Sequence, residues 1–360
     1  MKRLLLVLVV ALFPINAFAG WVSLPPMPSP TEGAVAWVAG DAAYVAGGGT
    51  RGEVSAAVWR FTVDGGWESV GELPVPVREA GGAFVGTKLY LAGGFDGESY
   101  GDALQIFDVG SRGWTTGANL PETRFGHGLT ALDGKLYLTG GGNSAGQAQA
   151  SVWVYDTAGD SWSTAPAMAT ARKHHAAAAQ GGKLYVFGGV NNDGDAPAYL
   201  DSAEVYDPAS QTCSALAAMP SSGWGGVATS LPDGLWVCAG LQDGGVASTC
   251  HVYDADGDAW TDGLAMPFAA YRVASAAAGA IVAGGEEVGE RGYEVIARVA
   301  VWREASADDD DDDDDDNDVD DDDDNDVDDD DDDDNDDDAS PDDDEPAADD
   351  GDDDKNGCGC

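Results

Sequence analysis

Histidine and basic residues are scarce in this chain of 360 residues. It contains 17 Lys and Arg against 66 Asp and Glu, a formal net charge of −49, and only 4 His. We expect no nucleic-acid partner, because phosphates are bound by clusters of Lys and Arg. The histidines suggest no catalytic constellation, and the adjacent His174 and His175 would point to opposite faces of a strand, so they could not easily share a metal. The four are His127, His174, His175 and His251.

Long apolar runs are also missing beyond the N-terminus. Residues 1–19 resemble a secretory signal, with Lys2-Arg3, an apolar core from Leu4 to Phe13 and a small-x-small site ending at Ala19. The core is too short to span a bilayer. Cleavage between Ala19 and Gly20 would give a secreted, periplasmic or cell-surface protein without a transmembrane segment in the mature chain.

The 5 cysteines are too few for a disulfide scaffold. Cys238 falls late in one expected strand and Cys250 early in the next, so a hairpin could bring them face to face. A cross-strand disulfide is one interpretation, and two unpaired buried thiols are the other. Cys358 and Cys360 end the chain, where they suggest an attachment point, an exposed thiol pair or an intramolecular disulfide.

Residues 307–360 form an acidic tail that is almost pure Asp from Asp308 to Lys355. Such a segment buries too little apolar surface to offset the entropy of ordering, so we expect it to be disordered and extended. Its simplest role is a solvated spacer. The alternative is weak association with calcium, which prefers carboxylate oxygens, although the tail lacks the turn-forming glycine of a discrete calcium loop. No other cofactor is expected.

Two markers recur in phase along the rest of the chain. A glycine pair returns every 45 to 51 residues, and a second marker, tryptophan in every unit except the fifth, precedes it by 26 residues in the first five units and by 24 in the sixth. Ala239-Gly240 replaces the fifth pair, and Cys213 stands where the fifth aromatic would be. The glycine pairs begin at Gly47, Gly93, Gly140, Gly188 and Gly284, and the tryptophans are Trp21, Trp67, Trp114, Trp162 and Trp260. A repeat of this length indicates stacked or radial β units.

Each unit predicts four strands, here named a to d. The segment Lys88 to Gly94 is rich in strand-forming residues and ends in the glycine pair, so it is strand b. A tight turn such as Asp133-Gly134 precedes strand b, a Val-Tyr-Asp segment marks strand c, and the tryptophan lies on strand d. This pattern resembles the kelch repeat from Trp21 to Trp302, and the resemblance implies an all-β, six-bladed propeller over residues 20–306.

The chain ends of this repeat array predict how the ring closes. Trp21 has no strands a to c before it, whereas the sixth unit reaches strand c near Val299 to Trp302 and stops. We therefore expect Trp21 to Leu24 to supply strand d of the last blade, which would remove the exposed edges of an open array.

Candidate ligand-binding residues lie in the loops that join strand b to c and strand d to the next a. The b–c loop varies most in length, which suggests that this set of loops carries recognition; the longest contains Asn192, Asp193 and Asp195. On the d–a loops, four arginines follow their tryptophans by 10 to 12 residues and would form a partial ring able to bind carboxylates. They are Arg78, Arg124, Arg172 and Arg272. The alternative is that they brace the loops.

The sequence therefore favours a binding module at or outside the cell surface, with an unknown protein or glycan ligand on the b–c and d–a face. The arginines there would suit an anionic ligand. The alternative is a carbohydrate-active enzyme, because kelch propellers include exported sialic acid mutarotases; no motif places catalytic residues. Asp254 to Asp258 resembles the start of a calcium loop, but it falls at a c–d turn, where Asp and Gly serve the turn itself.

Overall fold

The structure, a computed structural model, describes residues 20–40, 42–192, 198–242, 245–273, 281–289 and 292–303. The segment 1–19, the acidic tail, Asp193, Asp195, Cys358 and Cys360 lie outside these residues. Every regular element in the described ranges is a β-strand. Among these described residues there is no helix with the length and hydropathy needed to cross a membrane.

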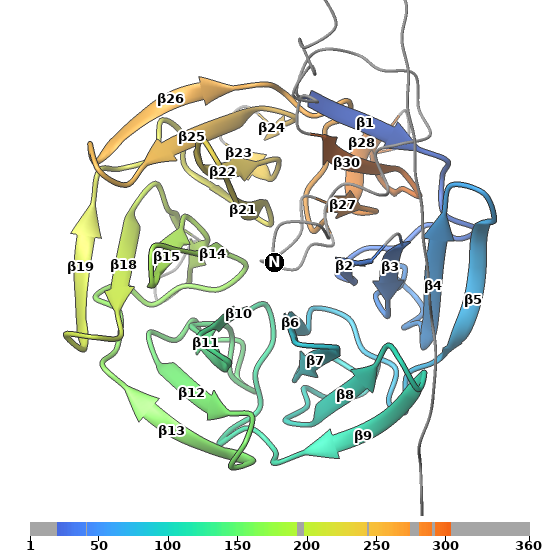
Figure 1. Ribbon diagram of the computed structural model, residues 1–360. Helices are drawn as coiled ribbons and strands as arrows, with labels where there is room; N and C mark the ends of the chain where they lie inside the picture. Colours follow the sequence, from blue (N-terminus) through green and yellow to red (C-terminus); the bar gives the residue numbers. More distant parts are fainter. Residues whose placement is uncertain are drawn as a thin grey trace, which may run out of the picture. The chain divides into compact units, whose positions relative to one another are not determined.

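Six antiparallel sheets are arranged radially around one axis (Figure 1), which confirms the predicted six-bladed propeller. Blade 1 contains β2 (Val35–Ala39), β3 (Ala42–Ala46), β4 (Ala57–Thr62) and β5 (Gly66–Glu72). Blade 2 contains β6 (Gly81–Val85), β7 (Lys88–Ala92), β8 (Leu104–Asp108) and β9 (Gly113–Gly117). Blade 3 contains β10 (Gly128–Leu132), β11 (Lys135–Thr139), β12 (Val152–Asp156) and β13 (Ser161–Ala165).

The remaining blades follow the same order from the axis outward. Blade 4 contains β14 (Ala176–Gln180), β15 (Lys183–Phe187), β18 (Ala203–Asp207) and β19 (Thr212–Leu216). Blade 5 contains β21 (Val227–Leu231), β22 (Gly234–Cys238), β25 (Cys250–Asp254) and β26 (Ala259–Gly263). The described strands of blade 6 are β27 (Ile281–Ala283), β30 (Val299–Arg303) and β1 (Gly20–Leu24).

Strand β1 closes the ring as predicted. It pairs antiparallel with β30, with Trp21 opposite Trp302 and Leu24 opposite Val299. The outer strand of the last blade therefore comes from the start of the propeller and its inner strands from the end. This arrangement joins both ends of the repeat array in one sheet (Figure 1).

The glycine pairs lie where strand b meets the d–a loop of the next blade. Gly93 has a φ of 60° and Gly94 a φ of 96°, a region that glycine adopts most readily. A methyl group on Gly93 would also collide with the carbonyl oxygen of Arg124 in blade 3. The repeat therefore needs glycine for both conformation and close approach.

The tryptophan markers connect neighbouring blades at the rim. The indole N–H of Trp162 donates to the carbonyl of Ala118 at 2.9 Å, and that of Trp260 donates to Ala217 at 3.0 Å, each acceptor following strand d of the preceding blade. Trp67 and Trp21 make equivalent bonds to Pro25 and Leu264. Cys213 lies opposite Tyr206, just as Trp162 lies opposite Tyr155, so it occupies the tryptophan position.

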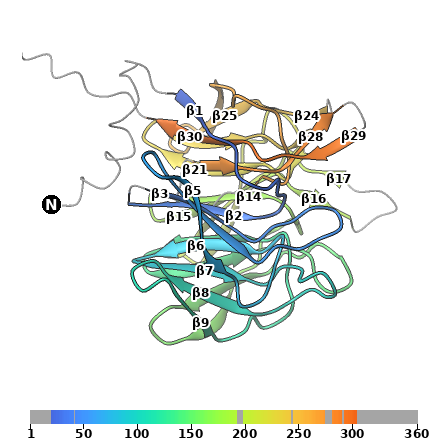
Figure 2. The same ribbon diagram turned by 90° about the vertical axis from the view of Figure 1, so that its right-hand side faces the viewer.

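Within the b–c and d–a loops the structure has short strands that the repeat pattern did not predict. They are β16 (Val190–Asn191), β17 (Ala198–Tyr199), β20 (Gly223–Trp224), β23 (Leu241–Gln242), β24 (Gly245–Val246), β28 (Glu286–Gly289) and β29 (Gly292–Val295). The hairpins β16–β17 and β28–β29 lie on the same side of the ring (Figure 2). Between β22 and β25, Cys238 and Cys250 are paired residues joined by a disulfide with an S–S distance of 2.05 Å.

Candidate functional site

Each d–a loop contains three successive residues near one mouth of the propeller axis. We call them positions 10, 11 and 12, because they follow the tryptophan position by 10, 11 and 12 residues. In five blades the residue at 11 forms an isolated bridge with the start of the same blade's b–c loop, as Arg78 does with Phe95 and Phe125 with Gly142. Arg124 and Arg172 stand at 10, Arg78 at 11 and Arg272 at 12. The expected ring of four equivalent arginines is therefore wrong, because a difference of one residue changes where a side chain points.

Arg124 and Arg172 are buried inside the blades rather than exposed at the mouth. Arg172 is 0% exposed; it donates to Glu204 Oε1 at 2.7 Å and to the carbonyls of Gly188 and Ser202. Arg124 is 1% exposed and lies over the ring of Trp153, with its guanidinium carbon 4.3 Å from the ring centroid. Both side chains brace loops and are out of reach of a ligand at the mouth.

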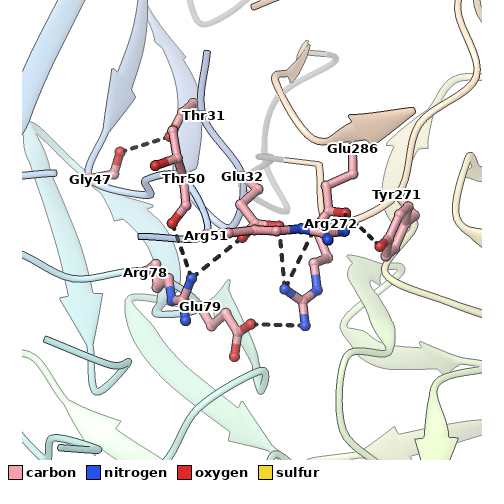
Figure 3. Close-up of polar contacts among 10 residues, drawn as sticks. All are labelled: Thr31, Glu32, Gly47, Thr50, Arg51, Arg78, Glu79, Tyr271, Arg272 and Glu286. Carbon is pink, nitrogen blue, oxygen red and sulfur yellow. Dashed lines mark hydrogen bonds and ion pairs between the residues drawn. The ribbon is translucent and has the colours of Figure 1, made fainter. Parts of the chain in front are cut away.

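Arg78 and Arg272 are partly exposed and belong to a network of charges where blades 6, 1 and 2 meet (Figure 3). The buried carboxylate of Glu32 lies 3.4 Å from Arg78 and 3.3 Å from Arg272. Arg272 also lies 3.5 Å from Glu79 and 3.7 Å from Glu286. The network thus places one guanidinium among three carboxyl groups.

Glu32 and Glu286 form a buried acid pair in this network. Burial and a hydrogen bond with Glu286 raise the pKa of Glu32 to about 7. Burial alone would raise the pKa of Glu286 as well, but hydrogen bonds with Glu32, Arg51 and Tyr271 hold it below its usual value. Glu32 is therefore the carboxyl group of the pair that binds a proton more readily, and it does so as the pH falls through neutrality.

The residues at position 12 form a ring around the axis. Their φ angles are all positive, from 51° to 70°, and backbone hydrogen bonds of 2.6 to 3.0 Å connect five of the six steps between blades. Glycine alternates with a polar residue around the ring: Gly33, Glu79, Gly126, His174, Gly225 and Arg272. An acid, an imidazole and a guanidinium therefore come from blades 2, 4 and 6.

Crowding explains this alternation. A methyl group on Gly126 would lie 2.6 Å from the imidazole of His174, and one on Gly33 would lie 3.1 Å from the amide nitrogen of Glu79. A methyl group on the third glycine, Gly225, would lie 2.9 Å from the amide nitrogen of Arg272. The three glycine positions therefore leave little room for a side chain at the axis.

The three polar residues border an axial cavity of about 130 Å³. His174 lies between the rings of Phe125 and Trp224, at centroid distances of 5.8 and 5.3 Å. Burial lowers the pKa of His174 to about 4, so its imidazole is neutral at pH 7. Burial also lowers the pKa of the nearby Lys173, whose Nζ donates to the carbonyl of Gly146.

Deeper in the channel, His127 and His175 lie between blades. The imidazole Nε2 of His175 is 2.9 Å from the Thr139 hydroxyl of blade 3, whereas neither ring nitrogen of His127 has a partner among the described residues. Burial lowers the pKa of His127 to about 3. His174 precedes β14 rather than lying on a strand. The expectation that it and His175 occupy opposite faces of one strand is therefore wrong. The two side chains still have different surroundings, since His174 lies between Phe125 and Trp224 and His175 lies beside Thr139.

Aromatic side chains surround the mouth, and the sequence analysis missed them. Neighbouring ring centroids are 4.1 to 5.8 Å apart along an arc from blade 2 to blade 6. The arc runs through Phe95, Tyr100, Phe125, His174, Trp224, Tyr271 and Tyr293. Three of these rings stand at position 11, so a count from each tryptophan could have found them.

Two other candidate sites serve structure. Asn192 accepts from the amide of Ala148 and donates to the carbonyl of Gly146, which connects the b–c loops of blades 4 and 3. Asp254 accepts the amide of Asp256 within the c–d turn. In the described ranges no group of three or more His, Cys, Asp or Glu is placed to hold a metal ion.

Fold and site together define a six-bladed β-propeller with polar and aromatic side chains gathered at one mouth of its axis. A KLHDC2/KLHL20/DRC7 Kelch-repeats domain model matches residues 115–270, and a Kelch motif model matches residues 76–121. Among solved structures, YjhT aligns with a TM-score of 0.66 and 16% identity over 78% of this chain and 99% of its own, a likeness of fold alone. No curated protein matches the chain significantly. The chain is a kelch-repeat β-propeller protein.

Proposed function

We propose that this protein is an exported binding module whose partner, a protein or a glycan, docks on the face formed by the b–c and d–a loops. One observation carries the proposal. Five large hydrophobic side chains are exposed among the described residues, and three of them belong to the hairpins β16–β17 and β28–β29 on this face. They are Tyr199, Val288 and Tyr293, exposed by 36%, 64% and 45%.

The surroundings of these side chains suit a ligand. Tyr199 lies 6.5 Å from Trp224 and Tyr293 lies 5.5 Å from Tyr271, so the exposed rings continue the aromatic arc. Rigid aromatic side chains beside arginine are typical of binding hot spots. The propeller scaffold holds them on short paired strands, which limits the entropy lost on binding.

The test is a screen of the whole protein on glycan and peptide arrays, followed by the double variant Tyr199→Ser/Tyr293→Ser. We expect a saturable ligand whose affinity falls at least about tenfold in this variant, a loss of about 1.4 kcal/mol. Leu264→Ser is the matched control, because Leu264 is 56% exposed at the rim. No saturable ligand, or an equal loss in the control, would contradict the proposal.

A second candidate function is a carbohydrate-active enzyme of the sialic acid mutarotase kind. The observation that favours it is the pKa of about 7 for Glu32, because such a group gives and takes protons at neutral pH. The check is anomer exchange in a sugar acid followed by NMR. Catalysis should accelerate exchange in the native protein and should be lost in Glu32→Gln.

A further inference from the structure

We propose that the axial cavity is a binding site for a small monocarboxylate, separate from the macromolecular surface described above. The site is bounded by Glu79, His174 and Arg272, which come from three different blades and converge on one cavity. A concave pocket with a few convergent polar groups is the usual form of a small-molecule site. Here the polar groups stand in an otherwise small-residue ring.

The size of the cavity indicates how much of a ligand it can enclose. Its volume is about 130 Å³, and a cavity of about 150 Å³ holds one benzene molecule, so about six non-hydrogen atoms fit. A hexose is larger than this. The cavity can therefore enclose a short-chain acid whole, whereas a sugar would extend out of its open mouth.

Arg272 supplies the recognition of the carboxylate. Its contacts with Glu32, Glu79 and Glu286 are 3.3, 3.5 and 3.7 Å long, whereas charge-assisted hydrogen bonds measure about 2.7 to 2.9 Å. Arg172, by comparison, donates to Glu204 at 2.7 Å. The guanidinium of Arg272 can therefore turn to a closer acceptor.

Charge and shape support the same ligand. The connected charged groups at this end of the axis are Arg51, Arg78, Lys173 and Arg272 against Glu32, Glu79 and Glu286, so their formal charges sum to +1. The aliphatic end of the acid would contact Ala176, Val227 and Val273, which also line the cavity. A monoanion with a short apolar chain matches both features.

The probes are butyrate and butyramide, which have the same shape and differ in charge. With 4 His in the chain, the imidazole signals of the whole protein are few, and His174→Gly assigns the one at the axis. We expect butyrate to shift the His174 signals saturably and to leave those of His251 in place, and we expect no shift with butyramide. Equal shifts with both probes, or none with butyrate, would overturn the proposal.

Variants at the ring sharpen the test. Arg272→Gly should raise the Kd for butyrate at least about tenfold, a loss of about 1.4 kcal/mol, and glycine suits the positive φ of that position. Glu79→Gly removes a competing carboxylate and should lower the Kd. Arg298→Gly, an exposed arginine of the same blade paired with Glu287, is the control. An unchanged Kd in Arg272→Gly contradicts the proposal; if that variant does not fold, the comparison of the two probes in the native protein decides.

This outcome is independent of the surface ligand. The Tyr199→Ser/Tyr293→Ser variant should keep its affinity for butyrate, because both tyrosines lie outside the cavity lining. Loss of butyrate binding in that variant would show that the probe sits on the rim and would overturn the axial site. Loss of binding to the macromolecular ligand alone would not contradict the axial site.

Discussion

Blades 3 and 5 differ from blades 2 and 4 in where they place polar side chains. At the rim of blade 3, Asp160 accepts hydrogen bonds from the Tyr155 hydroxyl and from the amide of Ala118 in blade 2, both at 2.6 Å. Asp258 of blade 5 makes the same pair of bonds. The equivalent residues of blades 2 and 4 are Arg112 and Gln211, yet these are the blades that place Glu79 and His174 at the axis.

The difference suggests a division of labour between neighbouring repeats. Blades 3 and 5 hold the preceding blade at the rim and keep glycine at the axis. Blades 2 and 4 contribute less to the rim and carry the side chains of the candidate site. If this is right, substitutions at the rim of blades 3 and 5 should lower stability, and those at the axis of blades 2 and 4 should change ligand binding.

The largest expected effect is at the rim of blade 5. Trp260 packs against Phe187 of blade 4 at 5.4 Å and donates its indole N–H to Ala217, so Trp260→Ala should cost about 3 kcal/mol of unfolding free energy. Cys213→Ala, at the same position of blade 4, should cost less than about 1 kcal/mol. Chemical denaturation measures both. Similar losses would show that the two kinds of blade do not differ.

The interface between blades 3 and 4 depends on an inner hydrogen bond instead. Thr139→Ala would leave buried Nε2 of His175 without its partner and should cost about 1 to 3 kcal/mol. In blade 2 the equivalent residue is Ala92, which lies opposite Gly81 beside His127. Ala92→Thr should therefore supply the missing partner of His127 and stabilise the protein by about 1 kcal/mol. A loss of stability in Ala92→Thr would show that the two interfaces are not equivalent.

The smallest effect is a pH dependence of the rim. Hydrogen bonds from Tyr155 and Ala118 lower the pKa of Asp160, and those from Ala217 and Tyr253 lower the pKa of Asp258. Because each folded pKa lies below the unfolded one, this stabilisation is present above about pH 4 and is lost as the pH falls through the folded pKa. The Tm of the native protein should exceed that of Asp160→Asn/Asp258→Asn at pH 7, and the gap should narrow below pH 4. A constant gap would contradict the assignment.

Most of the fold could be predicted from the sequence because its signals repeat. The glycine pair, the tryptophan and the closing strand from Trp21 to Leu24 each follow from a constraint that recurs in blade after blade. The site could not be predicted at the same level, because positions 10, 11 and 12 of one turn point into a blade, to the mouth and to the axis. Arg172, Arg78 and Arg272 look alike in sequence, yet the first points into a blade, the second to the mouth and the third to the axis.

The repeat pattern also does not predict which residues contact one another in the site. Glu32 belongs to the first d–a loop and Glu286 to the last b–c loop, so nothing local connects them. Their meeting depends on ring closure. The pKa of about 7 for Glu32 is a property of the closed ring and has no signal in either segment alone.

The crowding at the axis also bears on blade number. In this ring each side chain at position 12 follows a glycine in the preceding blade, and such an alternating ring closes only when the number of blades is even. A propeller with an odd number would have to leave two adjacent glycines and lose one side chain. An even number of blades therefore allows a side chain in every second blade around such a channel. Duplication of two blades together, rather than of one, would enlarge the propeller while keeping this pattern.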